Sequence, residues 1–223
     1  MAEAPAPSRL SVARLILIPG FITLAVTILR LVGELQHWSS AWFNRSMGAS
    51  IIGITWLAPV FGIYFALRLS NTDQQPTSFL RAIWYSVLGT LVVVGLAFAP
   101  GLLGVEHSFY GRLLYGWAIF VAGALVAGLG WPALFKTLLA YGYFARLPVA
   151  IIMFLAYRGN WGTHYDAVPS DVPTLSLVPK YLWLGFFPQL VLWIAYTILS
   201  GMLLGTLVAG IARLVKLERR APV

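Results

Sequence analysis

The sequence contains no cysteine. This absence excludes disulfide bonds, thiolate metal sites, iron–sulfur clusters and cysteine nucleophiles. Charged residues are scarce: they make up 10% of the 223 residues, against about a quarter in soluble domains, whereas 60% are hydrophobic. The short alternating segments of a membrane β-barrel are also missing. We therefore expect an all-α protein whose apolar segments cross a membrane as helices.

Apolar runs long enough to cross a hydrocarbon layer of about 30 Å recur along the chain. They predict a polytopic helix bundle of about six spans, which forms a single transmembrane domain over residues 15–216. Tails of residues 1–14 and 217–223 flank it, and the first span is expected to be retained rather than cleaved as a signal peptide. The predicted spans are residues 15–35, 51–67, 82–103, 113–129, 132–157 and 188–212.

Two segments of this outline need a choice between alternatives. If residues 132–157 form one helix, Arg146 lies near the middle of the membrane, where an unpaired charge costs about 2.5 kcal/mol or more. The alternative places residues 136–146 along the interface, but it leaves too few residues to cross, so the single helix is preferred. Residues 158–181 are expected to form an outer loop, and residues 181–187 to lie at the surface before a span that starts near Pro188.

The basic residues predict the orientation and one class of partner. Fifteen Lys and Arg against seven Asp and Glu give a net charge of +8. Because these residues lie in short loops and at span ends, they indicate contact with anionic lipid headgroups rather than nucleic acid. More of them fall on the side of the N-terminus, so both termini are expected to be cytoplasmic, and in a bacterium the membrane would be the plasma (inner) membrane.

A polar stripe runs along the first span. Thr23, Thr27, Arg30, Glu34 and His37 follow one another at intervals of three or four residues, so they share one helix face. Lipid cannot solvate such a face, and we expect it to point into the bundle or into a wet cavity open to the outer side. Either Arg30 and Glu34 simply pair with each other, or the stripe forms one wall of a ligand or metal site.

All three histidines fall on the predicted outer side, each near a carboxylate: His37 with Glu34, His107 with Glu106, and His164 with Asp166. Histidine and carboxylate suit zinc, iron or manganese, although no complete metal motif and no haem signature is present. The outer loop is expected to cover the bundle above the stripe. The candidate ligand-binding residues are Arg30, Glu34, His37, His107, His164 and Asp166, and the candidate metal ligands are His37, His107, His164 and Glu34.

The last span carries small residues on one face. Gly201, Gly205 and Ala209 recur every fourth residue, a spacing that lets two helices approach closely. Packing within the chain is the preferred interpretation, and a homodimer through Gly201 and Gly205 is the alternative.

No motif of a known family occurs with any specificity, so function is predicted only as a class. The leading hypothesis is a non-catalytic bundle, an accessory subunit or a small-ligand binder, with a polar site open to the outer face. The first alternative is a membrane-embedded, metal-dependent enzyme built on the outer histidines and carboxylates. The second is a small transporter that uses Arg146 in the membrane. The sequence defines neither a cofactor nor a catalytic residue.

Overall fold

The computed structural model describes residues 10–45 and 50–218. Within these residues the regular structure is entirely helical, as predicted. The chain forms α1 (Val12–Leu35), α2 (Leu57–Leu69), α3 (Phe79–Leu103), α4 (Phe109–Gly128) and α5 (Pro132–Gly159). A continuous last helix follows, made of α6 (Leu177–Lys180), η1 (Tyr181–Phe186), η2 (Pro188–Leu192) and α7 (Trp193–Glu218).

Five helical stretches in the described part of the chain are long and apolar enough to cross a membrane: α1, α3, α4, α5 and the stretch Leu177–Lys216. The protein is therefore a multi-pass integral membrane protein. α2 is apolar too, but its 13 residues are too few to cross a whole bilayer as a helix.

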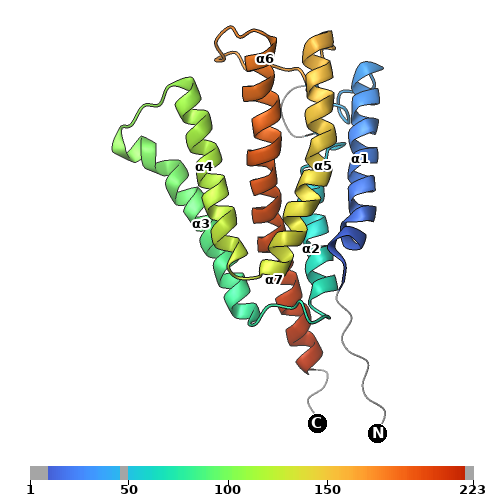
Figure 1. Cartoon of the computed structure of the whole chain (residues 1–223), viewed down its shortest axis with the longest axis vertical. Coiled ribbons are helices and arrows are strands. Elements are labelled where there is room, and N and C mark those ends of the chain that lie inside the picture. The colour runs from blue at the N-terminus through green and yellow to red at the C-terminus, as the bar shows by residue number, and fades with distance from the viewer. Residues whose placement is uncertain (1–9, 46–49, 219–223) are drawn as a thin grey trace.

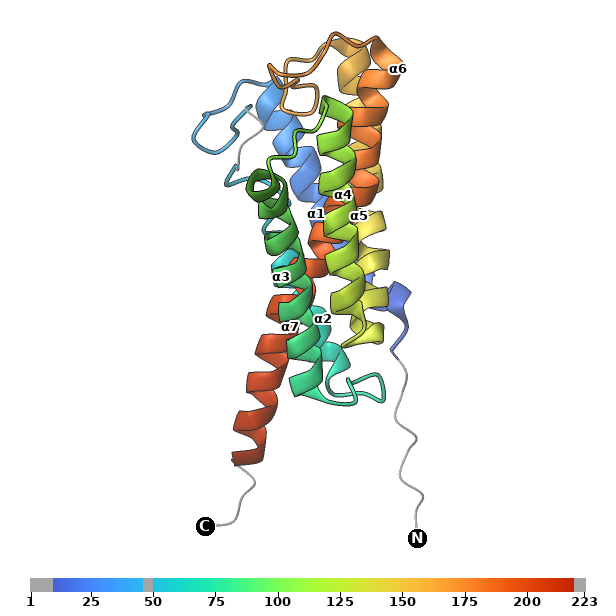
Figure 2. The same cartoon turned by 90° about the vertical axis from the view of Figure 1, so that its left-hand side faces the viewer.

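The start of α1 and the end of α7 lie at the same end of the bundle (Figure 1). We call this end the inner end and the opposite end the outer end; the basic residues predict that the inner end is cytoplasmic. The last helix runs through most of the height of the molecule (Figure 2). α2 occupies only the inner half, and the segment that leads into it descends from the outer end (Figure 1).

The second predicted span therefore begins later as a helix than its apolar residues indicate. Residues 51–56 form bends and turns, and α2 starts at Leu57. One of the backbone carbonyls in this segment has a local partner, since Trp56 Nε1 donates to the Ile51 carbonyl at 3.2 Å. Irregular backbone at membrane depth is tolerated where it lines a cavity or is buried in protein, and residues 54 and 55 line the cavity described below.

The last helix begins earlier than predicted, at Leu177 rather than near Pro188. Residues 181–187, which were predicted to lie at the surface, are helical, and the outer loop ends at Ser176. Pro188 lies inside this helix, where its ring would clash with the preceding turn. Wide π-helical turns, η1 and η2, relieve this conflict.

Two other predictions, the unbroken fifth helix and the close packing of the small residues in the last helix, concern the core of the inner half. Phe65 and Leu69 of α2, Leu138 of α5 and Met202 of α7 are completely buried, and α5 is a single helix through Arg146, as preferred. The small-residue face of α7 packs on α2 within the chain: a Cβ atom on Gly62 would lie 2.2 Å from the Gly201 Cα and a Cβ on Gly205 would lie 2.7 Å from the Gly62 carbonyl oxygen. Ala209 is also buried. A homodimer through this face would have to displace α2.

Candidate functional site

A cavity of about 280 Å³ lies between α1, α5 and the wide turns of the last helix. The lead-in to α2 and the outer loop complete its wall. Its polar lining residues are Thr27, Arg30, Thr55, Arg146, His164, Tyr165 and Gln189. The rest of the lining is largely apolar and includes Ile54, Val149, Met153 and Leu184. The cavity thus places two arginines beside a hydrophobic surface.

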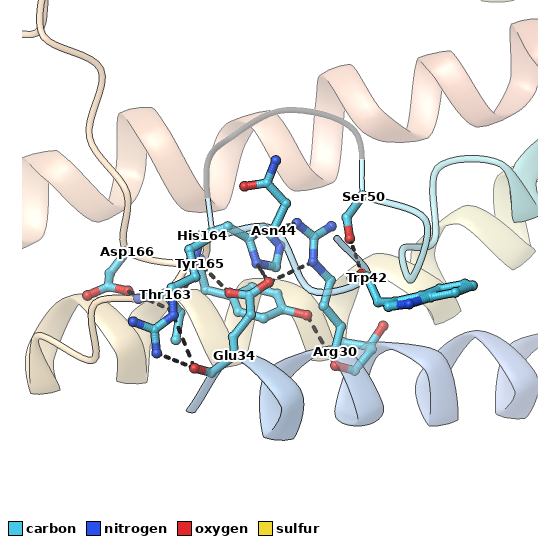
Figure 3. Close-up of polar contacts among 11 residues, drawn as sticks. Arg30, Glu34, Trp42, Asn44, Ser50, Thr163, His164, Tyr165 and Asp166 are labelled. Atoms are coloured by element: carbon cyan, nitrogen blue, oxygen red, sulfur yellow. Dashed lines mark hydrogen bonds and ion pairs between the residues drawn. The ribbon is translucent and has the colours of Figure 1, made fainter. Parts of the chain in front are cut away.

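The polar stripe of α1 faces the bundle interior, as predicted, for four of its five residues; His37 is exposed and lies beyond the end of the helix. Thr23, Thr27, Arg30 and Glu34 are all buried, and Glu34 is only 1% exposed. Arg30 Nε donates to Glu34 Oε1 at 2.8 Å, and its Nη2 donates to the Asn44 carbonyl at 3.1 Å (Figure 3). The i,i+4 pair of Arg30 and Glu34 expected from the sequence is therefore formed, and the Glu34 carboxylate is completely buried.

Glu34 also holds the outer loop. The backbone N–H of His164 donates to Glu34 Oε2 at 2.8 Å, and the His164 Nδ1 atom lies 2.6 Å from Glu34 Oε1 (Figure 3). The next residue adds a second attachment, because the Tyr165 hydroxyl donates to the Thr27 carbonyl at 3.1 Å. The outer loop thus lies over the outer part of α1, as predicted.

Asp166 has a local role in the same loop. Its carboxylate accepts hydrogen bonds from the backbone N–H groups of Gly162 and Thr163 and from the Thr163 hydroxyl, at 2.7–2.9 Å. These contacts fold residues 162–166 into a tight turn that presents His164 and Tyr165 to α1. Asp166 is absent from the cavity wall, so it positions the two residues that do contribute to it.

The environment of the loop controls the charge of His164. Burial lowers the pKa of His164, and the positive charge of Arg30 acts in the same direction, while Glu34 and Asp166 oppose them. Burial raises the pKa of the Tyr165 hydroxyl. Both side chains are therefore neutral near pH 7, and Arg30 supplies the positive charge that balances Glu34.

Arg146 is the least compensated charge in the cavity. It is 4% exposed and lies within α5. Its Nη1 donates to Gln189 Oε1 at 3.3 Å, and its Cζ lies 4.7 Å from the centroid of the Trp193 ring. Glu34 pairs with Arg30 and His164, and Asp171 pairs with Arg112, so neither carboxylate is engaged with Arg146. With Glu34 balanced by Arg30, the cavity retains one net positive charge.

The other two histidines lie elsewhere. His37 follows the end of α1 in a left-handed conformation, is exposed, and contacts Arg45 through Nδ1. His107 stacks on Tyr115 near the outer ends of α3 and α4, with 5.2 Å between ring centroids. Within residues 10–45 and 50–218, no group of three or more His, Asp or Glu side chains is arranged to hold a metal ion. The candidate metal ligands His37, His107 and His164 are thus not grouped with one another in these residues.

Sequence reasoning missed Gln189 and Trp193, which contact Arg146. A signal for Gln189 was present, because an amide directly after Pro188 interrupts an otherwise apolar run. Gln189 was not identified as a site residue because the span was expected to begin at Pro188, and a polar residue at a span end needs no partner.

Comparison with known proteins adds one partial likeness. The chain is 28% identical over 201 residues to the probable potassium transport system protein Kup of Xanthomonas oryzae pv. oryzae. The aligned part covers 84% of this chain but 30% of that relative's length. No family model matches the chain. No solved structure matches it either. The likeness is to a membrane transporter and agrees with the multi-pass architecture.

Proposed function

We propose that this protein binds a small organic anion in the cavity between Arg30 and Arg146. The observation that carries the proposal is the buried Arg146 guanidinium, which faces the cavity with an amide and an indole as its partners. A charged side chain at membrane depth is costly and commonly marks a binding site or a path for substrate. An anionic ligand would supply the missing countercharge.

The shape and lining of the cavity support an organic anion rather than a simple ion. Val149, Met153 and Leu184 offer an apolar wall beside the two guanidinium groups. A guanidinium matches a carboxylate or a related oxyanion through two parallel hydrogen bonds. A volume of about 280 Å³ leaves room for a body of a few carbon atoms, at the lower end of ordinary ligand pockets.

The position of α2 also favours an anion. Half-helices in membrane proteins often direct their positive N-termini toward anionic groups. Thr55, two residues before α2 begins, lines the cavity, so the N-terminus of α2 lies near it. The helix dipole therefore adds to the charge of Arg146 instead of opposing it.

Transport is a second candidate function, favoured by the partial likeness to Kup. Potassium itself fits the cavity poorly, because hard cations need several oxygen ligands and are repelled by guanidinium groups. If this chain takes part in transport, the substrate at this cavity is the anion. A direct test of potassium transport uses a bacterial strain that lacks its own potassium uptake. The strain is grown at low potassium with and without this protein.

Binding is tested with three ligands of one shape and different charge: benzoate, benzamide and benzamidine. Isothermal titration calorimetry with the detergent-purified protein should detect benzoate, and should give at least about tenfold weaker or no binding for the neutral amide and the cation. Equal binding of all three, or preference for benzamidine, would overturn the proposal.

Two variants of α5 locate the charge that matters. Arg146→Met removes the buried charge and should weaken benzoate binding at least about tenfold. Arg158→Gln is the matched control, since it removes an exposed charge near the outer end of the same helix. Because a buried ion is replaced by an apolar side chain, the unfolding temperature of Arg146→Met should be unchanged or higher. Lost binding with lost stability would instead indicate a structural role for Arg146.

A further inference from the structure

We propose that the pocket takes up its anion together with a proton, which is accepted by the imidazole of His164. This inference rests on the proposed anion site and adds its regulation. On binding, a proton from solvent would bond to the ring nitrogen of His164 that has no hydrogen before the anion arrives. The imidazole, neutral until then, would become positive and would compensate part of the ligand's negative charge.

The position of His164 makes it the group that can respond. Its side chain lies between Glu34 on one side and the cavity on the other, and it is 19% exposed. Its ring also packs against the Tyr165 ring, with centroids 3.8 Å apart. Any anion held between Arg30 and Arg146 therefore comes close to an imidazole that is already on the cavity wall.

Several charged groups surround His164 in the described residues. α1 contributes Arg30 and Glu34, the loop contributes Asp166 and the neutral Tyr165, and α5 contributes Arg146 across the cavity. The two arginines are matched by Glu34 and Asp166, and burial is the main cause that lowers the pKa of His164. A bound anion adds a negative charge beside the ring, which offsets the cost of burying a charged imidazole and favours its protonation.

The coupling must be reciprocal. If the anion strengthens proton binding at His164 by some factor, protonation strengthens anion binding by the same factor. Two unit charges about 6 Å apart at an effective dielectric constant of about 20 correspond to a factor of about a hundred. Since solvent reaches the outer loop, a coupling of about tenfold is the conservative expectation.

The probe for this test is benzenesulfonate, which stays ionised throughout the experiment, so that any pH dependence belongs to the protein. Calorimetric titrations at pH 7 in two buffers of different ionisation enthalpy give the number of protons taken up on binding. We expect an uptake of up to about half a proton, the most that a tenfold coupling allows, and an affinity that rises several-fold between pH 8 and pH 6. A variant His164→Gln should bind with the same affinity at both pH values.

His107→Gln is the matched control, because His107 lies near the outer ends of α3 and α4, away from the cavity. It should keep both the proton uptake and the pH dependence. Benzenesulfonate binding without proton uptake, or proton uptake that persists in His164→Gln, would overturn this inference while leaving the anion site intact. Absence of binding by benzenesulfonate and benzoate alike would overturn the anion site itself. The comparison of buffers uses the unaltered protein, so it does not depend on the folding of either variant.

Discussion

The carboxylate of Glu34 accepts the backbone N–H of His164 at 2.8 Å, and this contact joins residues that are 130 positions apart in the chain. Glu34 also pairs with Arg30, at 2.8 Å. One buried side chain therefore holds the end of α1, the guanidinium on the cavity wall and the loop that covers the cavity. The stability of the outer end should depend on it.

Substitution Glu34→Gln should destabilise the protein by about 3 kcal/mol, because it leaves Arg30 buried without its countercharge. Reversible denaturation in mixed micelles measures the change. Asp171→Asn is the control: it breaks the Arg112–Asp171 pair, whose side chains are 55% and 63% exposed, and should cost less than about 1 kcal/mol. Equal, small effects of the two substitutions would show that the Glu34 contacts do not hold the outer end together.

The docking of the outer loop should weaken in mild acid. The pKa of His164 is lowered in the folded protein relative to its ordinary value of 6.5, so the unfolded chain binds more protons once the pH falls below that value. The contribution of neutral His164 to folding stability is therefore fully present above pH 6.5, and it decreases as the pH falls from 6.5 toward the lowered folded-state pKa.

Hydrogen exchange of the amides of residues 162–166, followed between pH 8 and pH 5 and corrected for the intrinsic pH dependence, should show this loss of protection. His164→Gln should remove the pH-dependent part. Protection that rises below pH 6.5 would mean that the Glu34–His164 pair is strongest when His164 is charged, which is the opposite of the direction that a lowered His164 pKa requires.

The crossing of α2 and α7 should tolerate no added atom at Gly62. Gly62→Ala should destabilise the protein by about 2 kcal/mol, because the new methyl group meets the Gly201 backbone, which cannot rotate away. Gly116→Ala in α4 is the control, since no atom lies within 4 Å of its Cβ position, and helix propensity should make it neutral or slightly stabilising. Denaturation of both variants checks the prediction, and equal stability would contradict the close approach.

The absence of cysteine makes the topology simple to test by labelling. Thr77→Cys lies before α3 at the inner end, and Ser170→Cys lies in the outer loop; both positions are exposed. In intact cells a membrane-impermeant maleimide should label Ser170→Cys alone if the inner end is cytoplasmic. Labelling of Thr77→Cys alone would reverse the predicted orientation, and labelling of both or neither would contradict an odd number of passes between the two positions.

Sequence alone predicted what hydrophobicity and helix periodicity control. These include the helical membrane architecture, the inward face of α1 up to Glu34 and the unbroken α5 through Arg146. Each follows from the cost of exposing a polar group or a backbone carbonyl to lipid.

What was not predicted depends on contacts between distant segments. The lead-in to α2 is as apolar as a helix, and only its position beside Arg30 explains why it can remain irregular. The stripe was extended to His37 because the spacing allows it, but the chain leaves the helix after Leu35. Gln189 accepts a hydrogen bond from Arg146, which is 43 positions away in the chain, so no local sequence pattern could predict this contact.

The anion site is best tested by a crystal structure of the protein with 4-bromobenzoate, because the anomalous signal of bromine locates the ligand without ambiguity. We expect a bromine peak against the apolar wall of the cavity near Met153 and Leu184, with the carboxylate between Arg30 and Arg146. A ligand bound at the hollow beside His107 or in the groove near Arg213, with this cavity empty, would contradict the proposed binding of an anion between the two arginines.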